Sequence, residues 1–415
     1  MNNSALPFLP TTRREFLRRS TQGIGLLAFS RFAPSFLVQS TLAAAPAPEK
    51  DRTILVLVQL AGGNDGLNTV VPFEDADYYR LRPTLGIAKR EVLPVSDTLG
   101  FHPACAALHE LLRNGELGVV QNVGYPNPNR SHFRSTEIWE TASDSGEFLT
   151  SGWIGRFMDN ACAGAPTPEH PACVHVTGDQ PQSFASEQEH STFGLTPGVR
   201  GGGRNEGGRL LEAMLDGDDH QEGNAGFLKH TMMNALVTEK KVQRVLTGYR
   251  PETTYPDTGF AGALRSVAAL IAAGFSTRVY FVSLSGFDTH GSQLPQHARL
   301  LRTLSEGLAA FQRDLKAHRL DGQVTTMTFS EFGRRPSENE SGGTDHGTAA
   351  PLFVMGSRVK AGLHGSAPSL RLERNQDLTY STDFRSVYAT MLDRWLACES
   401  AAVLGGEFRG LPLFA

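Results

Sequence analysis

The sequence predicts an α/β fold in which a central, mostly parallel sheet is flanked by helices. Short apolar runs rich in β-branched residues alternate along the chain with amphipathic stretches of helical period. Several of these runs are followed at once by acidic and histidine residues, as is typical of the carboxyl ends of strands in open α/β sheets. No internal repeat interrupts this alternation. We therefore expect residues 46–415 to form a single domain.

The alternation assigns each predicted element to a segment of the chain. We expect strands at 53–60, 117–120, 173–177, 279–285, 324–329 and 352–355. We expect helices at 103–114, 131–141, 223–246, 259–273, 295–318 and 382–396, several of which begin at Ser, Thr or Pro and end near Gly or Asn. Residues 196–208 contain three consecutive glycines and predict a flexible loop that could cover a site.

The first 45 residues are typical of a twin-arginine signal peptide. Residues 12–17 read Thr-Arg-Arg-Glu-Phe-Leu, and an apolar segment and a stretch of small residues follow. The apolar segment is too short to span a bilayer and is followed by Arg31, so we expect no stable membrane anchor. We expect the twin-arginine translocase to export the protein to the periplasm or beyond, with cleavage near residues 43–45.

Charge and cysteine content narrow the functional classes. Removal of residues 1–45 takes away five arginines and one glutamate, so the formal net charge changes from −4 to −8. An acidic protein of this kind is not expected to bind nucleic acid. The four cysteines have no metal-type spacing. Disulfides are permitted after export; Cys162 with Cys173 is the favoured pair, and Cys105 and Cys398 are either buried thiols or a second bridge.

Two predicted strands lead to paired acid and imidazole groups. Asp288 and His290 follow the strand at 279–285 and are separated by one residue, so their side chains share a face if the segment is extended. Asp345 and His346 precede the strand at 352–355. Carboxylate and neutral imidazole are the ligands of zinc and similar divalent ions. The sequence therefore predicts a site for one or two such ions.

Two further acids follow other predicted strands. Asp65 lies in a Gly-Gly-Asn-Asp-Gly turn after the first strand, where an ordinary turn residue is the competing interpretation. Glu331 follows the strand at 324–329. His297 is a weaker candidate ligand. His102, His109 and His175 are expected to be structural. His132 and His364 are also expected to be structural, but they are held in reserve as possible ligands.

The chain resembles the alkaline phosphatase superfamily, which includes sulfatases and cofactor-independent phosphoglycerate mutases. More closely, it resembles an exported, largely uncharacterised family related to sulfatases. The resemblance rests on Asp-His-Gly-Thr-Ala-Ala-Pro-Leu at 345–352, on the glycine that follows this strand, and on Thr-Asp-Phe at 382–384. It implies an alkaline-phosphatase-like sandwich in which His346, Asp288 and His290 hold a first metal ion and Asp65 contributes to a second.

Two features depart from the pattern of the phosphatases. Glu331-Phe332 stands where those enzymes carry Asp-His, so a phenyl ring replaces a coordinating imidazole; a competing alignment places Asp345-His346 at that pair. No sulfatase-type Cys-x-Pro-x-Arg is present. Ser131 is the candidate nucleophile, since a serine that begins a helix favours a phosphate or sulfate there, with Arg130 adding charge.

Three functions are compatible with these residues. The first is a periplasmic metal-dependent hydrolase of phosphate or sulfate esters, acting on a small-molecule or polysaccharide ester. The alternative is a non-catalytic exported relative that binds metal or polysaccharide in cell-surface assembly. Transfer of the group, as in the mutases, is a weaker third hypothesis.

Overall fold

The computed structural model describes residues 52–161, 170–195 and 224–414, and it confirms the expected fold class. A nine-stranded sheet has the order β11-β5-β10-β9-β1-β8-β6-β7, with β12 also paired to β5, and a small sheet has the order β2-β4-β3. The strands are β1 (Ile54–Ala61), β2 (Val70–Val71), β3 (Leu93–Pro94), β4 (Gly100–Phe101), β5 (Leu117–Gly124), β6 (Cys173–Val176), β7 (Thr192–Gly194), β8 (Val279–Ser285), β9 (Val324–Phe329), β10 (Ala350–Met355), β11 (Gly362–His364) and β12 (Thr382–Asp383).

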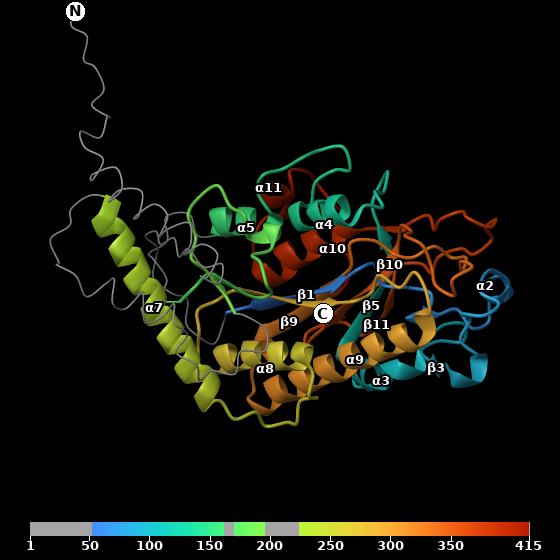
Figure 1. Ribbon diagram of the computed structural model, residues 1–415, viewed down its shortest axis with the longest axis horizontal. Helices are drawn as coiled ribbons and strands as arrows, with labels where there is room; N and C mark the ends of the chain where they lie inside the picture. The colour runs from blue at the N-terminus through green and yellow to red at the C-terminus, as the bar shows by residue number, and fades with distance from the viewer. Residues whose placement is uncertain (1–51, 162–169, 196–223, 415) are drawn as a thin grey trace, which may run out of the picture.

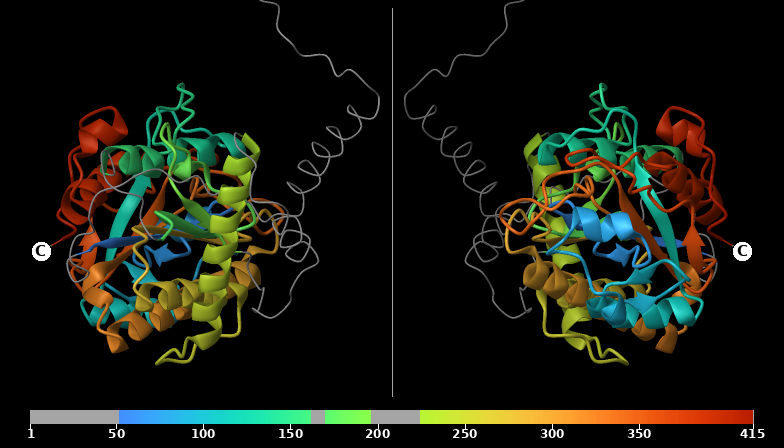
Figure 2. Two further views of the ribbon diagram at one scale, coloured as in Figure 1. Left: turned by 90° about the vertical axis from the view of Figure 1, so that its left-hand side faces the viewer. Right: turned by 90° about the vertical axis from the view of Figure 1, so that its right-hand side faces the viewer.

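Helices cover both faces of the large sheet. The helices are α2 (Ala76–Leu81), α3 (Ala106–Arg113), α4 (His132–Thr141), α5 (Trp153–Ala161), α7 (Asn224–Gly248), α8 (Gly259–Ala272), α9 (Gln293–Ala317), α10 (Phe384–Thr390) and α11 (Ser400–Leu404). Figure 1 shows α4, α5, α10 and α11 on one side of the sheet and α3, α8 and α9 on the other. In Figure 1 and Figure 2, α7 lies at one end of the molecule and extends between the two layers.

The first strand shows why both faces are covered. Its residues alternate between the two cores: Ile54 and Val56 belong to the cluster beneath α8 and α9, whereas Leu55 and Leu57 belong to the cluster beneath α4 and α10. All four side chains are fully buried. A strand that is apolar on both faces can be buried only inside a layered fold, because each face must be removed from water.

The directions of the strands bring five strand ends to one edge of the large sheet. β8 and β9 both pair in parallel with β1, and β6 pairs in parallel with β8. β10 is antiparallel to both of its neighbours, β9 and β5. The carboxyl ends of β1, β5, β8 and β9 and the amino end of β10 therefore lie at the same edge, where segments distant in the sequence meet.

The predicted elements are all present, with boundaries shifted by a few residues. The predicted helix at 382–396 is a short strand followed by α10 and a π-helical turn (Met391–Leu396). The short strands β2, β3, β4, β7 and β11 were not predicted, nor were the helices α2, α5 and α11. These strands have two or three residues each, too few to produce a hydrophobic period in the sequence.

Several predictions lie outside the described residues: the signal peptide, the loop at 196–208, and Cys162 with its favoured bridge to Cys173. Cys105 and Cys398 are free thiols; the first is buried and the second is partly exposed. Within 52–161, 170–195 and 224–414, no helix has both the length and the apolar character needed to span a bilayer.

Candidate metal centre

Side chains from four of the strand ends meet at one edge of the sheet. Asp288 and His290 follow β8, Glu331 follows β9, and His346 precedes β10. His132 is the first residue of α4, a short distance along the chain from the end of β5. The sheet topology thus brings five residues from distant parts of the sequence to one place.

Asp288 is at the centre of this group. Its Oδ1 lies 3.0 Å from the Nε2 of His346 and 3.0 Å from the Nε2 of His290. Its Oδ2 lies 3.4 Å from the Nε2 of His132. The Asp288 side chain is 46% exposed, so solvent and ligands can reach the group.

All three imidazoles have an oxygen atom beside Nδ1. The Nδ1 of His346 lies 2.8 Å from the backbone carbonyl of Arg130, and the Nδ1 of His132 lies 2.9 Å from Glu331 Oε1. The Nδ1 of His290 lies 3.4 Å from Asp345 Oδ1. An acceptor at Nδ1 favours the tautomer that carries its proton there, which leaves the Nε2 lone pair available. Carbonyl and carboxylate partners of this kind are typical of histidines that bind metals.

The spacing of these atoms fits a divalent ion. Ligand atoms of His132, Asp288 and His346 all lie within 4.8 Å of one another. Tetrahedral zinc with bonds of about 2.0–2.1 Å sets neighbouring ligand atoms roughly 3.4 Å apart. The Nε2 atoms of His290 and His346 are 2.9 Å apart, close to that spacing. These residues therefore form a group able to hold a metal ion.

Charges around Asp288 keep it ionised. Burial raises its pKa, but the neighbouring Arg334, His346 and His290 together outweigh burial, and the pKa of Asp288 is held well below its usual range. Arg334 Nη2 donates to Asp288 Oδ1 at 2.6 Å, and its side chain is fully buried. The hydrogen bond to Glu331 raises the pKa of His132. Protons and metal therefore compete for His132 at a higher pH than for an ordinary histidine.

Two local features hold the group in position. Gly62 has a φ of +119°, and a Cβ there would lie 2.4 Å from the backbone nitrogen of Asp288. Only glycine therefore lets the turn after β1 approach the turn after β8 so closely. The Phe332 ring packs against His346 and His132 with centroid distances of 4.5 and 5.0 Å. The phenyl ring that departs from the phosphatase pattern thus forms a wall of the site.

Asp65 lies in a different environment. Its side chain is fully buried, and its Oδ2 pairs with Arg82 Nη1 at 2.6 Å and accepts from Gln293. Burial raises the pKa of Asp65, but Arg82 outweighs burial and the pKa is lowered. The structure does not bring Asp65 into the group around Asp288. Its charge is instead neutralised by an arginine from α2's carboxyl end.

The other predicted site residues are placed as follows. Ser131 is exposed and caps α4 without a side-chain hydrogen bond to it. Arg130 is exposed and pairs with Asp377. Asp345 accepts from Asn339 at 3.1 Å and lies beside His290, whereas Glu331 bonds to His132. His297 is buried and bonds to Asn64, away from the centre.

His132 is the member that sequence reasoning held only in reserve. No acidic residue stands beside it in the sequence to mark it as a ligand. The signal that could have found it is its position at the start of the predicted helix at 131–141, the helix that follows the predicted strand at 117–120, because such connections begin at the carboxyl edge of a parallel sheet.

A large cavity adjoins the centre. It has a volume of about 810 Å³ and is lined by Glu331, by residues of α4 including His132, and by the loop after β6 at 176–182. A volume of this size is typical of small-molecule sites.

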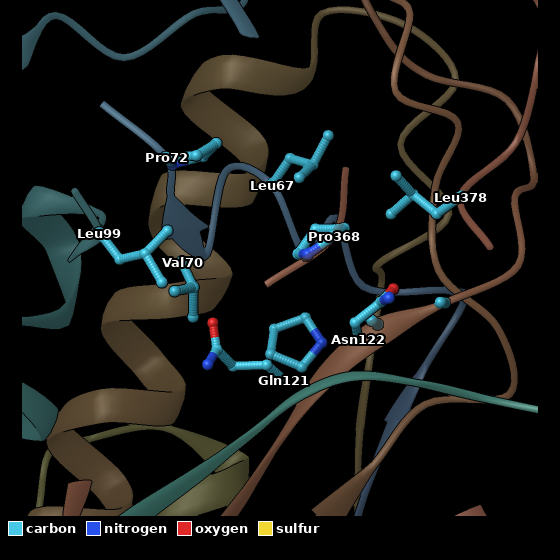
Figure 3. Close-up of a pocket in the computed structure, with 12 residues that line it drawn as sticks. Leu67, Val70, Pro72, Leu99, Gln121, Asn122, Pro368 and Leu378 are labelled. Atoms are coloured by element: carbon cyan, nitrogen blue, oxygen red, sulfur yellow. The ribbon is translucent and has the colours of Figure 1, made fainter. Parts of the chain in front are cut away.

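A second cavity, shown in Figure 3, is of a different kind. It has a volume of about 20 Å³ and is lined mainly by apolar side chains such as Leu67, Val70 and Leu378. That volume suffices for about one water molecule. Asn122, whose Oδ1 has no partner among the described residues, would bind such a water. We therefore regard this cavity as structural.

Comparison with known proteins gives a family. The family described as "Protein of unknown function (DUF1501)" matches residues 52–397. The chain belongs to the DUF1501 family. This confirms the assignment, made from sequence, to a family without an established function. No curated protein shows significant similarity to this DUF1501 protein.

Solved structures similar to this DUF1501 protein include sulfatases and a periplasmic domain. One is Ps i-CgsB in complex with k-i-k-neocarrahexaose, at 10% identity, a TM-score of 0.38, and coverage of 86% of this chain and 73% of the other. Another is the C-terminal periplasmic domain of EcEptC from Escherichia coli in complex with Zn, at 10% identity and a TM-score of 0.35; the match covers 76% of this chain and 76% of the other. A third is the PsFucS1 sulfatase from Pseudoalteromonas sp., at 10% identity and a TM-score of 0.33; the match covers 80% of this chain and 71% of the other.

Proposed function

We propose that this protein is an exported hydrolase of phosphate or sulfate esters that uses one divalent metal ion, preferably zinc. His132, Asp288 and His346 would hold the ion, with His290 beside them. The supporting observation is that three imidazoles, each with an oxygen beside Nδ1, direct Nε2 towards one ionised carboxylate. One of them, His132, also lines a large cavity. Residues 12–17 support export to the periplasm or beyond.

A metal ion at this position supplies a Lewis acid for an ester oxygen and lowers the pKa of a nearby water molecule. The protein supplies a base. Glu331 Oε1 is fixed by the backbone N–H of Gly62 at 2.7 Å and by His132, while Oε2 is buried and has no partner among the described residues. Because Glu331 also lines the cavity and its Oε2 has no other partner among the described residues, we assign Oε2 the role of accepting a proton from water.

The proposed reaction balances without a further reactant. The water oxygen forms a bond to phosphorus or sulfur, the bond to the alcohol oxygen breaks, and Glu331 takes the proton lost by the water. The departing alkoxide takes a proton from solvent water and leaves as the alcohol, and Glu331 releases its proton to solvent, which returns the site to its starting state. Ser131 remains the candidate for a covalent variant of this step, because its exposed hydroxyl precedes His132 directly.

The test joins metal content to turnover. Elemental mass spectrometry of the exported protein should find about one equivalent of metal, and Asp288→Ala should lose it. The metal-loaded protein should hydrolyse 4-nitrophenyl phosphate or 4-nitrophenyl sulfate, and a chelator should stop turnover. His109→Ala, at a histidine bonded only to the Pro94 carbonyl, is the control and should change neither result.

Two other outcomes would change the proposed function. Metal without turnover of either ester would favour the alternative, a non-catalytic exported relative that binds metal or polysaccharide in cell-surface assembly. Protein without metal, purified in the absence of chelator, would contradict the proposal.

A further inference from the structure

The large cavity beside the metal centre has a chemical character that the proposed reaction does not explain. It shares His132 and Glu331 with the centre, so a molecule bound at the centre extends into it. The α4 residues His132 and Glu140 both line it and are eight residues apart. At 1.5 Å per residue this corresponds to about 12 Å, which is room for a substantial alcohol group.

The lining of this cavity is acidic. Among its described lining residues there is no lysine or arginine, whereas four are acidic: Glu137, Glu140, Asp179 and Glu331. Glu137 is neutralised by Arg134 at 2.8 Å. Asp179 is exposed and forms no ion pair with another described residue. Asp179 and Glu140 therefore have no lysine or arginine partner among the described residues of the lining.

The arginines near the centre do not offset this charge. Arg334 is fully buried and donates to Asp288 and to several backbone carbonyls. Arg130 pairs with Asp377. An anionic group in the cavity would meet carboxylates without a free guanidinium, which is unfavourable.

Two further observations indicate a ligand. Glu331, which lines the cavity and is 2% exposed, has an Oε2 without a hydrogen-bond partner among the described residues. Phe133, also in the lining, is 91% exposed, which is unusual for a phenylalanine. An exposed aromatic ring beside unbalanced carboxylates is a favourable environment for an ammonium group.

We propose that the cavity binds the alcohol part of the ester, and that this alcohol carries a positive charge. Phe133 contacts the cation through its ring face, and Asp179 pairs with it. Glu140, which accepts from the Ser183 backbone N–H at 3.1 Å, closes the far end of the cavity. Burial raises the pKa of Glu140 to about 7, so this group both donates and accepts hydrogen bonds near neutral pH. This inference rests on the proposed function for the identity of the bound group as an ester.

The test uses three alcohols that differ mainly in charge: choline, its neutral isostere 3,3-dimethylbutan-1-ol, and the anionic 3-hydroxypropane-1-sulfonate. Their affinities for the metal-loaded protein would be measured by ligand-observed NMR. We expect choline to bind about tenfold more tightly than the neutral isostere, and the sulfonate to bind most weakly. Raising salt to 1 M, where the Debye length is about 3 Å, should weaken choline and leave the isostere unchanged.

Matched variants connect the preference to the named residues. Asp179→Asn and Phe133→Leu should each reduce the preference for choline at least threefold, and both sites are exposed enough to leave folding intact. Asp97→Asn, at an exposed acid outside the cavity lining, and Phe148→Leu, at another exposed aromatic, should leave it unchanged.

Equal affinities for choline and its isostere, or tighter binding of the sulfonate, would overturn the inference. Its failure can be told from failure of the proposed function, because binding is measured without turnover. A preference for choline without hydrolysis of nitrophenyl esters would support the inference about the cavity and contradict the proposed hydrolase. Hydrolysis without a preference for choline would support the hydrolase and contradict the inference about the cavity.

Discussion

Asp65 and Asp288 both follow a parallel strand, and each has an arginine partner, yet the two carboxylates have different surroundings. The Asp65 side chain is fully buried and enclosed by Arg82 and Gln293. The Asp288 side chain is 46% exposed and surrounded by three histidines. In the first region Arg82, Gln293 and the backbone N–H of Asn68 together occupy both oxygens of the acid. In the second region the arginine leaves an ionised carboxylate open to a ligand. Burial and partners, rather than position after a strand, distinguish a structural acid from a candidate ligand.

The largest expected effect is on folding at Asp65. Asp65→Ala leaves the Arg82 guanidinium buried without its counter-charge, which should lower the free energy of unfolding by about 3–5 kcal/mol. Asp288→Ala leaves Arg334 bonded to backbone carbonyls and should cost only about 1–2 kcal/mol. Urea denaturation of both variants measures the difference, and equal costs would remove the distinction between the two regions.

The same comparison predicts the response to acid. The pKa of Asp65 is lower in the folded than in the unfolded protein, so its contribution to stability is complete above the unfolded value of about 3.9. That contribution is lost as the pH falls through the folded pKa. As the pH falls below about 4, the free energy of unfolding should therefore decrease less for Asp65→Asn than for the unmodified protein.

The next effect is on metal binding at the exposed region. His346→Ala removes a ligand and should lower metal affinity by more than about 100-fold, beyond the range found for outer partners of metal ligands. Folding should change little, because His346 is partly exposed. Competition with a chromophoric chelator measures the affinity, and full retention of metal would remove His346 from the site.

A smaller effect is expected from the residue behind His132. Glu331→Gln keeps the size of the side chain but weakens the hydrogen bond to Nδ1, so metal affinity should fall by about 10–100-fold. Turnover should fall further than metal affinity if Glu331 Oε2 also accepts the proton from water. Metal binding at saturating concentration separates these two contributions. Equal losses would leave Glu331 only an orienting role.

The smallest effect is a shift in pH dependence. The hydrogen bond to Glu331 raises the pKa of His132, so protons should displace metal as the pH falls through a value above the usual 6.5 or so. Glu331→Gln should move this midpoint to lower pH. Chelator competition between pH 5 and 8 measures it, and a midpoint that does not respond to the substitution would exclude Glu331 as its cause.

Local sequence patterns were enough to predict the longer strands, the main helices and several residues of the candidate centre. A strand such as the one at 279–285 can be predicted from a nearly continuous run of apolar residues, because its side chains must be buried on both faces of the sheet. Asp288, His290 and His346 could be predicted because they stand beside such runs. Glu331 was also predicted at the site, although the structure places it behind His132 rather than among the atoms nearest Asp288.

Which of these residues lie side by side depends on the order of the strands in the sheet. His132 joins the centre because β5 lies beside β10, a strand order that no local pattern encodes. Asp65 is separated from it because Arg82, 17 residues along the chain, folds back to neutralise it inside the core. A charge in the interior must be paired, and the choice of partner depends on burial, which exists only once the chain has folded.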